Sequence, residues 1–276
     1  ALTHFLKNHA VDFIHTHHVI MSPIIAHRAL SSLKSSIPFV ITSHGSELTY
    51  SVRGNPQLKA YAIEGVSHAK ALFASSTYLK HLLLTEFKKA VPGIAGNIHI
   101  NPCGVNTREF VPVYDVKQKH IKQLESKLKQ KLTTQKKGKS GALKEGLKTR
   151  VRKGIKPGSL HSLITSIQSQ YDMHYLDQDC LQSLKHIAWG KDRIIIYVGK
   201  FMKTKGPQVV VNVLRRLAPK MPTLKCIFVG FGRDREYLES LIYKHKALDG
   251  RVFFTGLLEH AELKHLLPLA DMLIVP

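Results

Sequence analysis

The sequence is poor in cysteine and has no long apolar run. Its three cysteines, Cys103, Cys180 and Cys226, are far apart and form no Cys-x-x-Cys pair, which argues against a disulfide framework or a cysteine zinc site. We therefore expect a reducing compartment and place the protein in the cytoplasm. No apolar run approaches the roughly 20 residues that a spanning helix needs, so neither a transmembrane helix nor a signal peptide is expected.

Acidic residues are also scarce. Only 19 aspartates and glutamates stand against 41 lysines and arginines, a formal net charge of +22, which on its own suggests a nucleic-acid or anionic-membrane partner. The charge is unevenly spread, because residues 115–156 carry fifteen lysines and arginines against three acidic residues, a net of +12. The remaining +10 is an ordinary excess for a protein that handles phosphates, so nucleic acid is not expected as the substrate.

Apolar runs and helical patterns alternate over residues 1–112 and again over residues 191–276. Strands are expected at Val11–His15, Pro38–Ser43, Ala71–Ser75, Asn97–Asn101, Arg193–Val198, Leu224–Val229, Arg251–Thr255 and Met272–Val275. Helical patterns lie between them at Val19–Lys34, Pro56–Ala69, Tyr78–Lys89, Pro207–Ala218, Arg233–Lys246 and His260–Ala270. This alternation is typical of parallel sheets with crossover helices. We predict an α/β chain with two Rossmann-like domains, 1–112 and 191–276, the first incomplete at its start and the second at its end.

Residues 113–190 form a basic insertion and interdomain link. Ile121, Leu124, Leu128 and Leu132 recur at helical spacing and predict an amphipathic helix, whereas the glycines that follow predict loop or disorder. Further helical patterns cover Leu160–Gln168 and Leu176–Ile187. The segment is either a solvated surface insertion or an arm that contacts phosphates or anionic lipid.

The second half opens with a lysine-rich loop after its first strand. The stretch from Tyr197 to Pro207 reads as a buried strand, a glycine turn with three lysines and the first turn of a helix. Free backbone N–H groups at a helix start, together with lysine ammonium groups, hold a diphosphate well. The candidate diphosphate residues are Gly199, Lys200, Lys205 and Gly206, while Lys203 is expected to be a solvated neighbour.

A second glycine turn follows the next strand, at Gly230 and Gly232. It departs from the dinucleotide-binding fingerprint because Arg235 stands where the third glycine belongs. Taken alone these glycines are more often structural than ligand-binding. Ligands nevertheless collect at the carboxyl ends of strands in doubly wound sheets, so both remain candidates for lining the site.

Histidines cluster at two strand ends of the first half. Residues 14–18 read Ile-His-Thr-His-His, and His44 precedes Gly45 after the next strand. Clustered histidines can bind zinc, but no cysteine or acidic partner sits at ligand spacing among 17 histidines. We therefore expect no metal and prefer a polar role in which His17 and His44 face one cleft.

These motifs, taken in order, resemble a known enzyme family. The series includes Asp12-Phe-Ile-His-Thr-His, Ile37-Pro-Phe-Val-Ile-Thr-Ser-His-Gly, Ile100-Asn-Pro-Cys-Gly-Val-Asn-Thr-Arg-Glu-Phe110, Tyr197-Val-Gly-Lys with Lys205-Gly206, Val229-Gly-Phe-Gly, Val252-Phe-Phe-Thr-Gly256 and Ala270-Asp-Met-Leu-Ile-Val-Pro276. In this order and spacing it resembles the retaining GT-B glycosyltransferases of group 1, the glycogen-synthase-like type. The resemblance spans about residues 10–112 and 192–276.

The resemblance implies a sugar transfer from a nucleoside-diphosphate sugar to an acceptor, with retention of configuration and without a metal or other cofactor. His17 would be the catalytic histidine near the reacting carbon, and Lys205 would pair with the donor diphosphate. Lys200 stands where the family usually has arginine, which keeps the charge but loses the bidentate fork. His44, Gly45, Gly230, Gly232 and Leu257 would line the donor site. The acceptor, a glycan, lipid or small molecule, is left open.

The chain also departs from the family pattern. The family's glycine-rich loop after its first strand should precede residue 1, and two glutamates should follow Pro276, so we expect an inactive fragment of an active parent. The alternative to an enzyme is a protein that binds nucleic acid or an anionic membrane through residues 115–156, and peripheral membrane contact is also compatible with the enzyme. A nucleotide-sugar epimerase of the same fold is a further alternative that the motif series disfavours.

Overall fold

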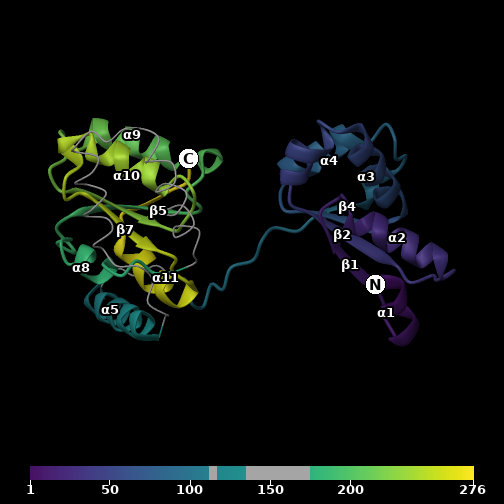
Figure 1. Ribbon diagram of the computed structural model, residues 1–276, viewed down its shortest axis with the longest axis horizontal. Helices are drawn as coiled ribbons and strands as arrows, with labels where there is room; N and C mark the ends of the chain where they lie inside the picture. Colours follow the sequence, from purple (N-terminus) through teal and green to yellow (C-terminus); the bar gives the residue numbers. More distant parts are fainter. Residues whose placement is uncertain (112–116, 135–174) are drawn as a thin grey trace, which may run out of the picture. The chain divides into compact units, whose positions relative to one another are not determined.

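The computed structural model describes residues 1–111, 117–134 and 175–276. The chain divides into two compact units, Ala1–Val105 and Asn106–Pro276, each visible as a body of its own in Figure 1. Within the described ranges, no helix is both long and apolar enough to cross a membrane.

The first unit is built on a parallel sheet of four strands. Their order is β1 (Ile14–His17), β2 (Phe39–Ser43), β3 (Ala71–Ala74) and β4 (Ile98–Ile100). The helical elements are α1 (Leu2–Asn8), α2 (Ser22–Ser32), the π-helical turn η1 (Leu48–Val52), α3 (Pro56–His68), α4 (Thr77–Phe87) and the 3-10 turn η2 (Ile94–Asn97). Ile41 and Leu72 of the sheet and Leu83 and Phe87 of α4 are fully enclosed. The core therefore lies between the sheet and its helices.

Local signals explain where two of these helices begin. The side chain of Asn55 accepts hydrogen bonds from the backbone N–H groups of Gln57 and Leu58, and Pro56 occupies the first helical position of α3. Ser76 caps α4 in the same way by accepting from Leu79 N–H at 3.2 Å. Each cap supplies a partner for N–H groups that the helix itself leaves unsatisfied.

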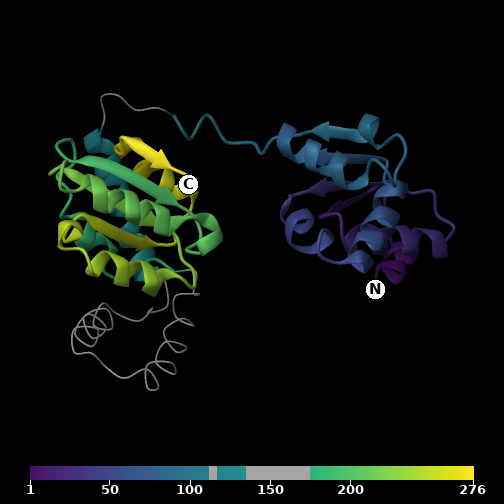
Figure 2. The same cartoon turned by 90° about the horizontal axis from the view of Figure 1, so that it is seen from above.

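The second unit repeats the architecture. Its parallel sheet has the order β7 (Val252–Gly256), β6 (Leu224–Val229), β5 (Arg193–Val198) and β8 (Met272–Ile274), with β8 as the yellow arrow at one edge in Figure 2. Helices α9 (Pro207–Leu217) and α10 (Arg235–Tyr243) cover one face, and α11 (His260–Leu266) covers the other (Figure 1). Short 3-10 turns lie at η3 (Lys203–Lys205), η4 (Lys246–Leu248) and η5 (Leu267–Leu269). The predicted α/β class with two parallel sheets is confirmed.

Part of the basic insertion folds onto this second unit. The predicted amphipathic helix is present as α5 (Lys117–Thr134), which packs against α11 and α8 (Cys180–Leu184). Leu124 and Leu128 are buried there, and Lys131 forms ion pairs of 3.3 Å with Glu259 and Glu262. The apolar side of α5 is thus already covered by protein and is not available to enter lipid. The expected loop around residues 138–154 and the helix at Leu160–Gln168 lie outside the described residues.

Three local predictions were wrong in detail. The helix expected over Leu176–Ile187 is confined to Cys180–Leu184, because Leu176 forms an antiparallel bridge to Gly256 and is held in extended conformation. The first strand runs from Ile14 to His17 rather than from Val11 to His15. The helix expected from Val19 begins at Ser22, after a tight turn in which His18 and Met21 have positive φ angles of 65° and 58°.

The three cysteines differ in exposure, which gives a direct check of the fold. Cys103 is exposed, whereas Cys180 and Cys226 are buried, and burial raises the pKa of the Cys226 thiol far above its usual range. We expect a chromogenic disulfide reagent to modify one thiol of the native chain rapidly and all three after denaturation. Cys103→Ser should abolish the rapid phase; a remaining rapid phase would contradict this packing.

Candidate functional site

In the first unit, the candidate histidines lie together at the carboxyl edge of the sheet. His17 is the last residue of β1 and pairs in register with Thr42 of β2, and His44 follows directly after the last residue of β2. His17 Nδ1 and His44 Nε2 are 2.9 Å apart and share a hydrogen bond. His15, two residues earlier on the same face, bonds to Thr42 Oγ1 through Nε2 at 2.8 Å. The two strand ends are therefore joined through their side chains.

A buried carboxylate ties these two strand ends together. Glu47 Oε1 accepts from Ser43 Oγ at 2.8 Å and from the backbone N–H of His44 at 3.1 Å, and its Oε2 lies 3.2 Å from His18 Nδ1. Burial alone would raise the pKa of Glu47, but hydrogen bonds from its own backbone, Ser43, His18 and His44 outweigh it and hold the pKa below its usual range. This stabilisation is present above the pKa of an unfolded glutamate and is lost as the pH falls through the lower, folded value.

The histidines do not form a metal centre. Among residues 1–111, 117–134 and 175–276, no group of three or more His, Cys, Asp or Glu side chains is arranged to hold a metal ion. The imidazoles of the cluster instead pair with each other, with Thr42 and with Glu47. The role of His17 and His44 in lining a cleft stays a prediction.

In the second unit, the lysine-rich loop leaves the carboxyl end of β5. Lys200 and Lys205 are exposed, as is Lys203, and Lys200 Nζ lies 5.8 Å from the ring centre of Phe231. The hydroxyl of Tyr197 lies 3.0 Å from the carbonyl oxygen of Lys200 and 3.3 Å from that of Lys205. Tyr197 is buried, and burial raises its pKa. It therefore stays a neutral hydrogen-bond donor that fastens both ends of the loop, a role the sequence did not reveal.

The start of α9 completes this loop. Gly206 occupies the left-handed conformation, with a φ of 69°, immediately before Pro207 at the first helical position. A Cβ on Gly206 would come within 2.7 Å of Pro276 Cγ, so the loop after β5 and the end of β8 approach closely. The residues expected to hold a diphosphate thus lie at the carboxyl end of β5, next to the N-terminus of α9.

Gly230 and Gly232 allow two loops to interlock. Gly230 has a φ of 135°, and a Cβ there would lie 2.1 Å from the carbonyl oxygen of Gly199. Gly232 has a φ of 149°, and a Cβ there would lie 2.5 Å from the carbonyl oxygen of Phe201. Backbone bonds from Phe201 N–H to Phe231 and from Asp234 N–H to Phe201 join the same loops. The close packing of the two loops therefore explains why both positions are glycine, whether or not they also contact a ligand.

Arg235, which breaks the glycine fingerprint, has the largest fully buried side chain in the part of the chain that the structure describes. Its guanidinium bonds to Asp177 at 2.9 Å and to Glu239 at 2.7 Å, and it lies 3.6 Å from the ring centre of Phe254. Asp177 lies within the insertion 113–190, where Tyr175 O also accepts from Leu257 N–H at 2.9 Å. Leu257, a predicted site residue, is thus held by its backbone beside β7. These contacts of Arg235 were not predictable from the sequence.

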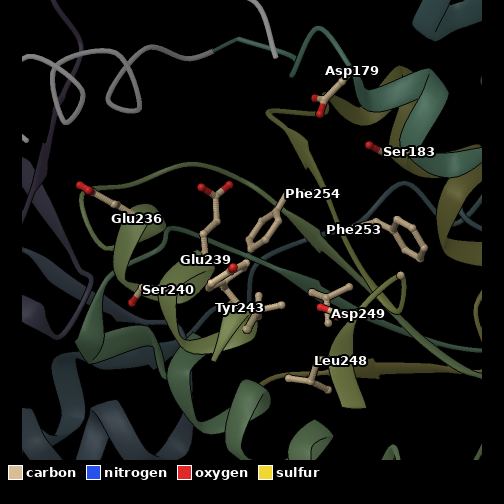
Figure 3. A pocket seen from close by; sticks show the side chains of 13 residues that line it. Asp179, Ser183, Glu236, Glu239, Ser240, Tyr243, Leu248, Asp249, Phe253 and Phe254 are labelled. Atoms are coloured by element: carbon tan, nitrogen blue, oxygen red, sulfur yellow. The ribbon is translucent and has the colours of Figure 1, made fainter. Parts of the chain in front are cut away.

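A separate pocket of about 260 Å³ lies in the second unit among α8, α10 and β7. Figure 3 shows Glu236, Glu239 and Tyr243 around it, with the rings of Phe253 and Phe254 nearby. Burial and the neighbouring Glu239 raise the pKa of Glu236. The candidate diphosphate residues Gly199, Lys200, Lys205 and Gly206 do not line this pocket, whereas Phe254, which begins the stretch expected near the nucleobase, does.

The chain has two α/β units, one with a histidine pair and one with a lysine-rich loop at the carboxyl ends of its strands. Residues 1–109 match the family model of Glycosyltransferase Family 4, and residues 183–276 match that of Glycosyl transferases group 1. The chain therefore belongs to the glycosyltransferases of group 1 and family 4, as the motif series predicted. No curated protein sequence matches it.

Solved structures place the fold in the same group. HepE from Anabaena, solved in complex with UDP, is 14% identical with a TM-score of 0.58 and is matched over 99% of this chain and 55% of its own. A glycosyltransferase from Rickettsia africae is 17% identical with a TM-score of 0.53, over 99% of this chain and 53% of its own. These similarities establish the GT-B fold, and the chain spans about half the length of the structures it matches.

Proposed function

We propose that this protein takes part in retaining transfer of a sugar from a nucleoside-diphosphate sugar to an acceptor, with no metal ion needed at the diphosphate. The single observation that carries the proposal is the loop from Gly199 to Pro207 on a group 1 domain. In this loop, Lys200, Lys205 and the N-terminus of α9 lie beyond the carboxyl end of β5. Positive charge and unsatisfied N–H groups at a helix start are what a diphosphate requires.

In this reaction, the groups around the leaving diphosphate have to stabilise the largest change in charge. As the bond from the anomeric carbon to the diphosphate oxygen breaks, negative charge grows on the diphosphate and positive charge grows on the sugar. Lys200 and Lys205, held by Tyr197 through their backbone carbonyls, would stabilise the departing charge as a preorganised electrostatic site. His17 would orient the sugar and the acceptor instead of acting as the nucleophile.

The donor class has support from the matched structures, since HepE was solved with UDP and with UDP-glucose. For this chain a UDP-sugar is therefore the first donor to test. The base, the sugar and the acceptor all belong to the proposal. Helix α5 also bears on the choice between an enzyme and a membrane binder, because its buried leucines leave only its lysine-rich outer side for contact with anionic lipid.

A donor panel tests the proposal. Thermal shift and then sugar transfer are measured with UDP-, GDP- and ADP-sugars, on the chain and on a form extended at both ends with its own flanking sequence. We expect one nucleotide to raise the midpoint of unfolding by several degrees, because a ligand that binds only the folded state stabilises it, and to support transfer by the extended form. Absence of both binding and transfer across the panel would overturn the proposal.

A further inference from the structure

The contact between His18 and Glu47 has only one possible direction. His18 Nδ1 lies 3.2 Å from Oε2 of Glu47, a carboxylate that is buried while the imidazole is half exposed. Although burial opposes the charge, the hydrogen bonds that Glu47 accepts hold its pKa below the usual range. Both carboxylate oxygens therefore carry only lone pairs at neutral pH, and the proton of this bond has to come from His18 Nδ1.

This direction sets the chemistry of the other ring nitrogen of His18. A neutral imidazole carries one proton, so a proton on Nδ1 leaves a lone pair on Nε2. Among the residues that the structure describes, none makes a hydrogen bond to His18 Nε2, and 48% of the side chain is exposed. The imidazole therefore presents a hydrogen-bond acceptor to a ligand, while its donor is used inside the protein.

The carboxylate of Glu47 is oriented by bonds that involve only its own unit. Its Oε1 accepts from Ser43 Oγ at 2.8 Å and from the backbone N–H of His44 at 3.1 Å. Ser43 is the last residue of β2 and is fully buried. Because two donors hold Oε1, Oε2 is the oxygen directed at His18. The partner of His18 is thus fixed before any ligand binds.

The backbone of His18 is also held in an unusual conformation. Among the described residues only three other than glycine have a positive φ, and two of them, His18 and Met21, lie in the turn after β1. His18 N–H donates to the carbonyl oxygen of Thr42 at 2.9 Å. Strained backbone of this kind persists only where its surroundings fix it, and it is concentrated at functional sites. His18 also lies at the carboxyl edge of the parallel sheet, where ligands bind in open α/β folds.

We propose that Glu47 holds His18 in the tautomer protonated at Nδ1, so that Nε2 accepts a hydrogen bond from a hydroxyl of the molecule that receives the sugar. Glu47 is then a positioning residue, and His18 is the residue that touches the substrate. A hydroxyl suits this site because it brings a proton to the lone pair, which a phosphate or carboxylate anion does not. The tautomer follows from the contacts of the chain, whereas the identity of the hydroxyl rests on the proposed function.

Nitrogen NMR of the whole chain labelled with ¹⁵N-histidine tests the tautomer, with His18→Asn used to assign the His18 signals. At about pH 9, well above the ordinary imidazole range, we expect the proton of His18 on Nδ1, although free histidine prefers Nε2. Glu47→Gln should reverse this preference. The amide oxygen has to replace Oε1 as acceptor for Ser43 and His44 N–H, so the amide NH₂ faces His18 and donates to Nδ1. The proton of His18 should then lie on Nε2.

Glu86→Gln is the matched control. Glu86 is another largely buried carboxylate of the first unit, but its partners are Arg53 and Lys59, so this variant should leave the His18 signals unchanged. A proton on Nε2 of His18 in the unaltered chain would overturn the inference, and that measurement needs no variant to fold. A proton that stays on Nδ1 in folded Glu47→Gln would also overturn it. Neither outcome depends on whether the protein transfers a sugar.

Transfer kinetics of the extended form test the role of Nε2, with UDP-glucose as donor and methyl glucoside as the hydroxyl probe. The amide NH₂ in His18→Asn replaces Nδ1 and keeps the bond to Glu47, but the variant lacks Nε2. We expect kcat/KM for methyl glucoside to fall about 10-fold, as for the loss of one hydrogen bond. The dissociation constant of UDP, measured by calorimetry, should stay within twofold. A purely structural His18 would leave both values unchanged.

The two readouts separate failure of this inference from failure of the proposed function. If the tautomer results hold and no donor in the panel is turned over, the proposed function fails and the Glu47–His18 pair stands without its hydroxyl ligand. If transfer occurs and His18→Asn matches the unaltered form, His18 does not bind the acceptor. The inference then fails and the proposed function stands.

Discussion

Replacing Lys205 by alanine should lower sugar-transfer turnover about 100-fold, the usual loss when one preorganised group is removed from a developing charge. Lys205 ends the turn η3, one residue before the left-handed Gly206 and the start of α9. Its carbonyl is near the hydroxyl of buried Tyr197, so its backbone is fixed although its side chain is exposed. The ammonium group of Lys205 is therefore accessible to an anion while its backbone is held in place.

Lys203 provides the matched control for this prediction. It lies two residues earlier in the same turn and is also exposed, so Lys203→Ala removes the same charge from the same loop. We expect Lys203→Ala to retain transfer within about threefold, and only Lys205→Ala to weaken binding of UDP measured by calorimetry. Equal losses in both variants would mean that the loop acts through diffuse charge alone. Unaltered kinetics in Lys205→Ala would sink its assignment to the diphosphate.

The sequence predicted the layers of the fold well because apolar runs and helical patterns alternate in both units, as in parallel sheets with crossover helices. Residues 194–198 are apolar without interruption, and helices α3 and α9 begin with a first-turn proline, preceded in α3 by the Asn55 cap. The lysine-rich loop was predictable for the same reason, since glycine, lysine and proline after a buried strand have few other arrangements. The features that the sequence predicted correctly depend on residues that are close together in the chain.

The parts that sequence could not reveal depend on contacts between distant segments. Leu176 lies in a helical pattern, yet its pairing with Gly256, some eighty residues away, keeps it extended. Arg235 looks like a misplaced surface residue until Asp177, Glu239 and Phe254 enclose it. Glu47 gives no local hint that it links two strand ends. Each is a case in which tertiary contacts override local preference or give a polar group its partner.

Among the variants proposed for this protein, Gly230→Ala is expected to have the largest effect on stability. Alanine there would place a Cβ 2.1 Å from the carbonyl oxygen of Gly199 at a φ of 135°, a conformation that costs a residue with a side chain free energy even in open space. Because the obstacle is backbone rather than a movable side chain, the interlocked loops must separate. We expect Gly230→Ala to lower the free energy of unfolding of the second unit by about 3–5 kcal/mol.

The single tryptophan of the sequence, Trp189, packs against the core of this unit, so its fluorescence in a urea titration follows the second unit alone. Gly250→Ala is the matched control: Gly250 has a φ of 65° with nothing within 4 Å of the added Cβ. It should therefore cost only the roughly 1–2 kcal/mol of a left-handed alanine. Similar losses in the two variants would show that backbone strain, not the close approach of Gly230 to Gly199, governs this edge. A clear excess in Gly230→Ala would show that the loop bearing Lys200 and Lys205 is held in place by the loop after β6.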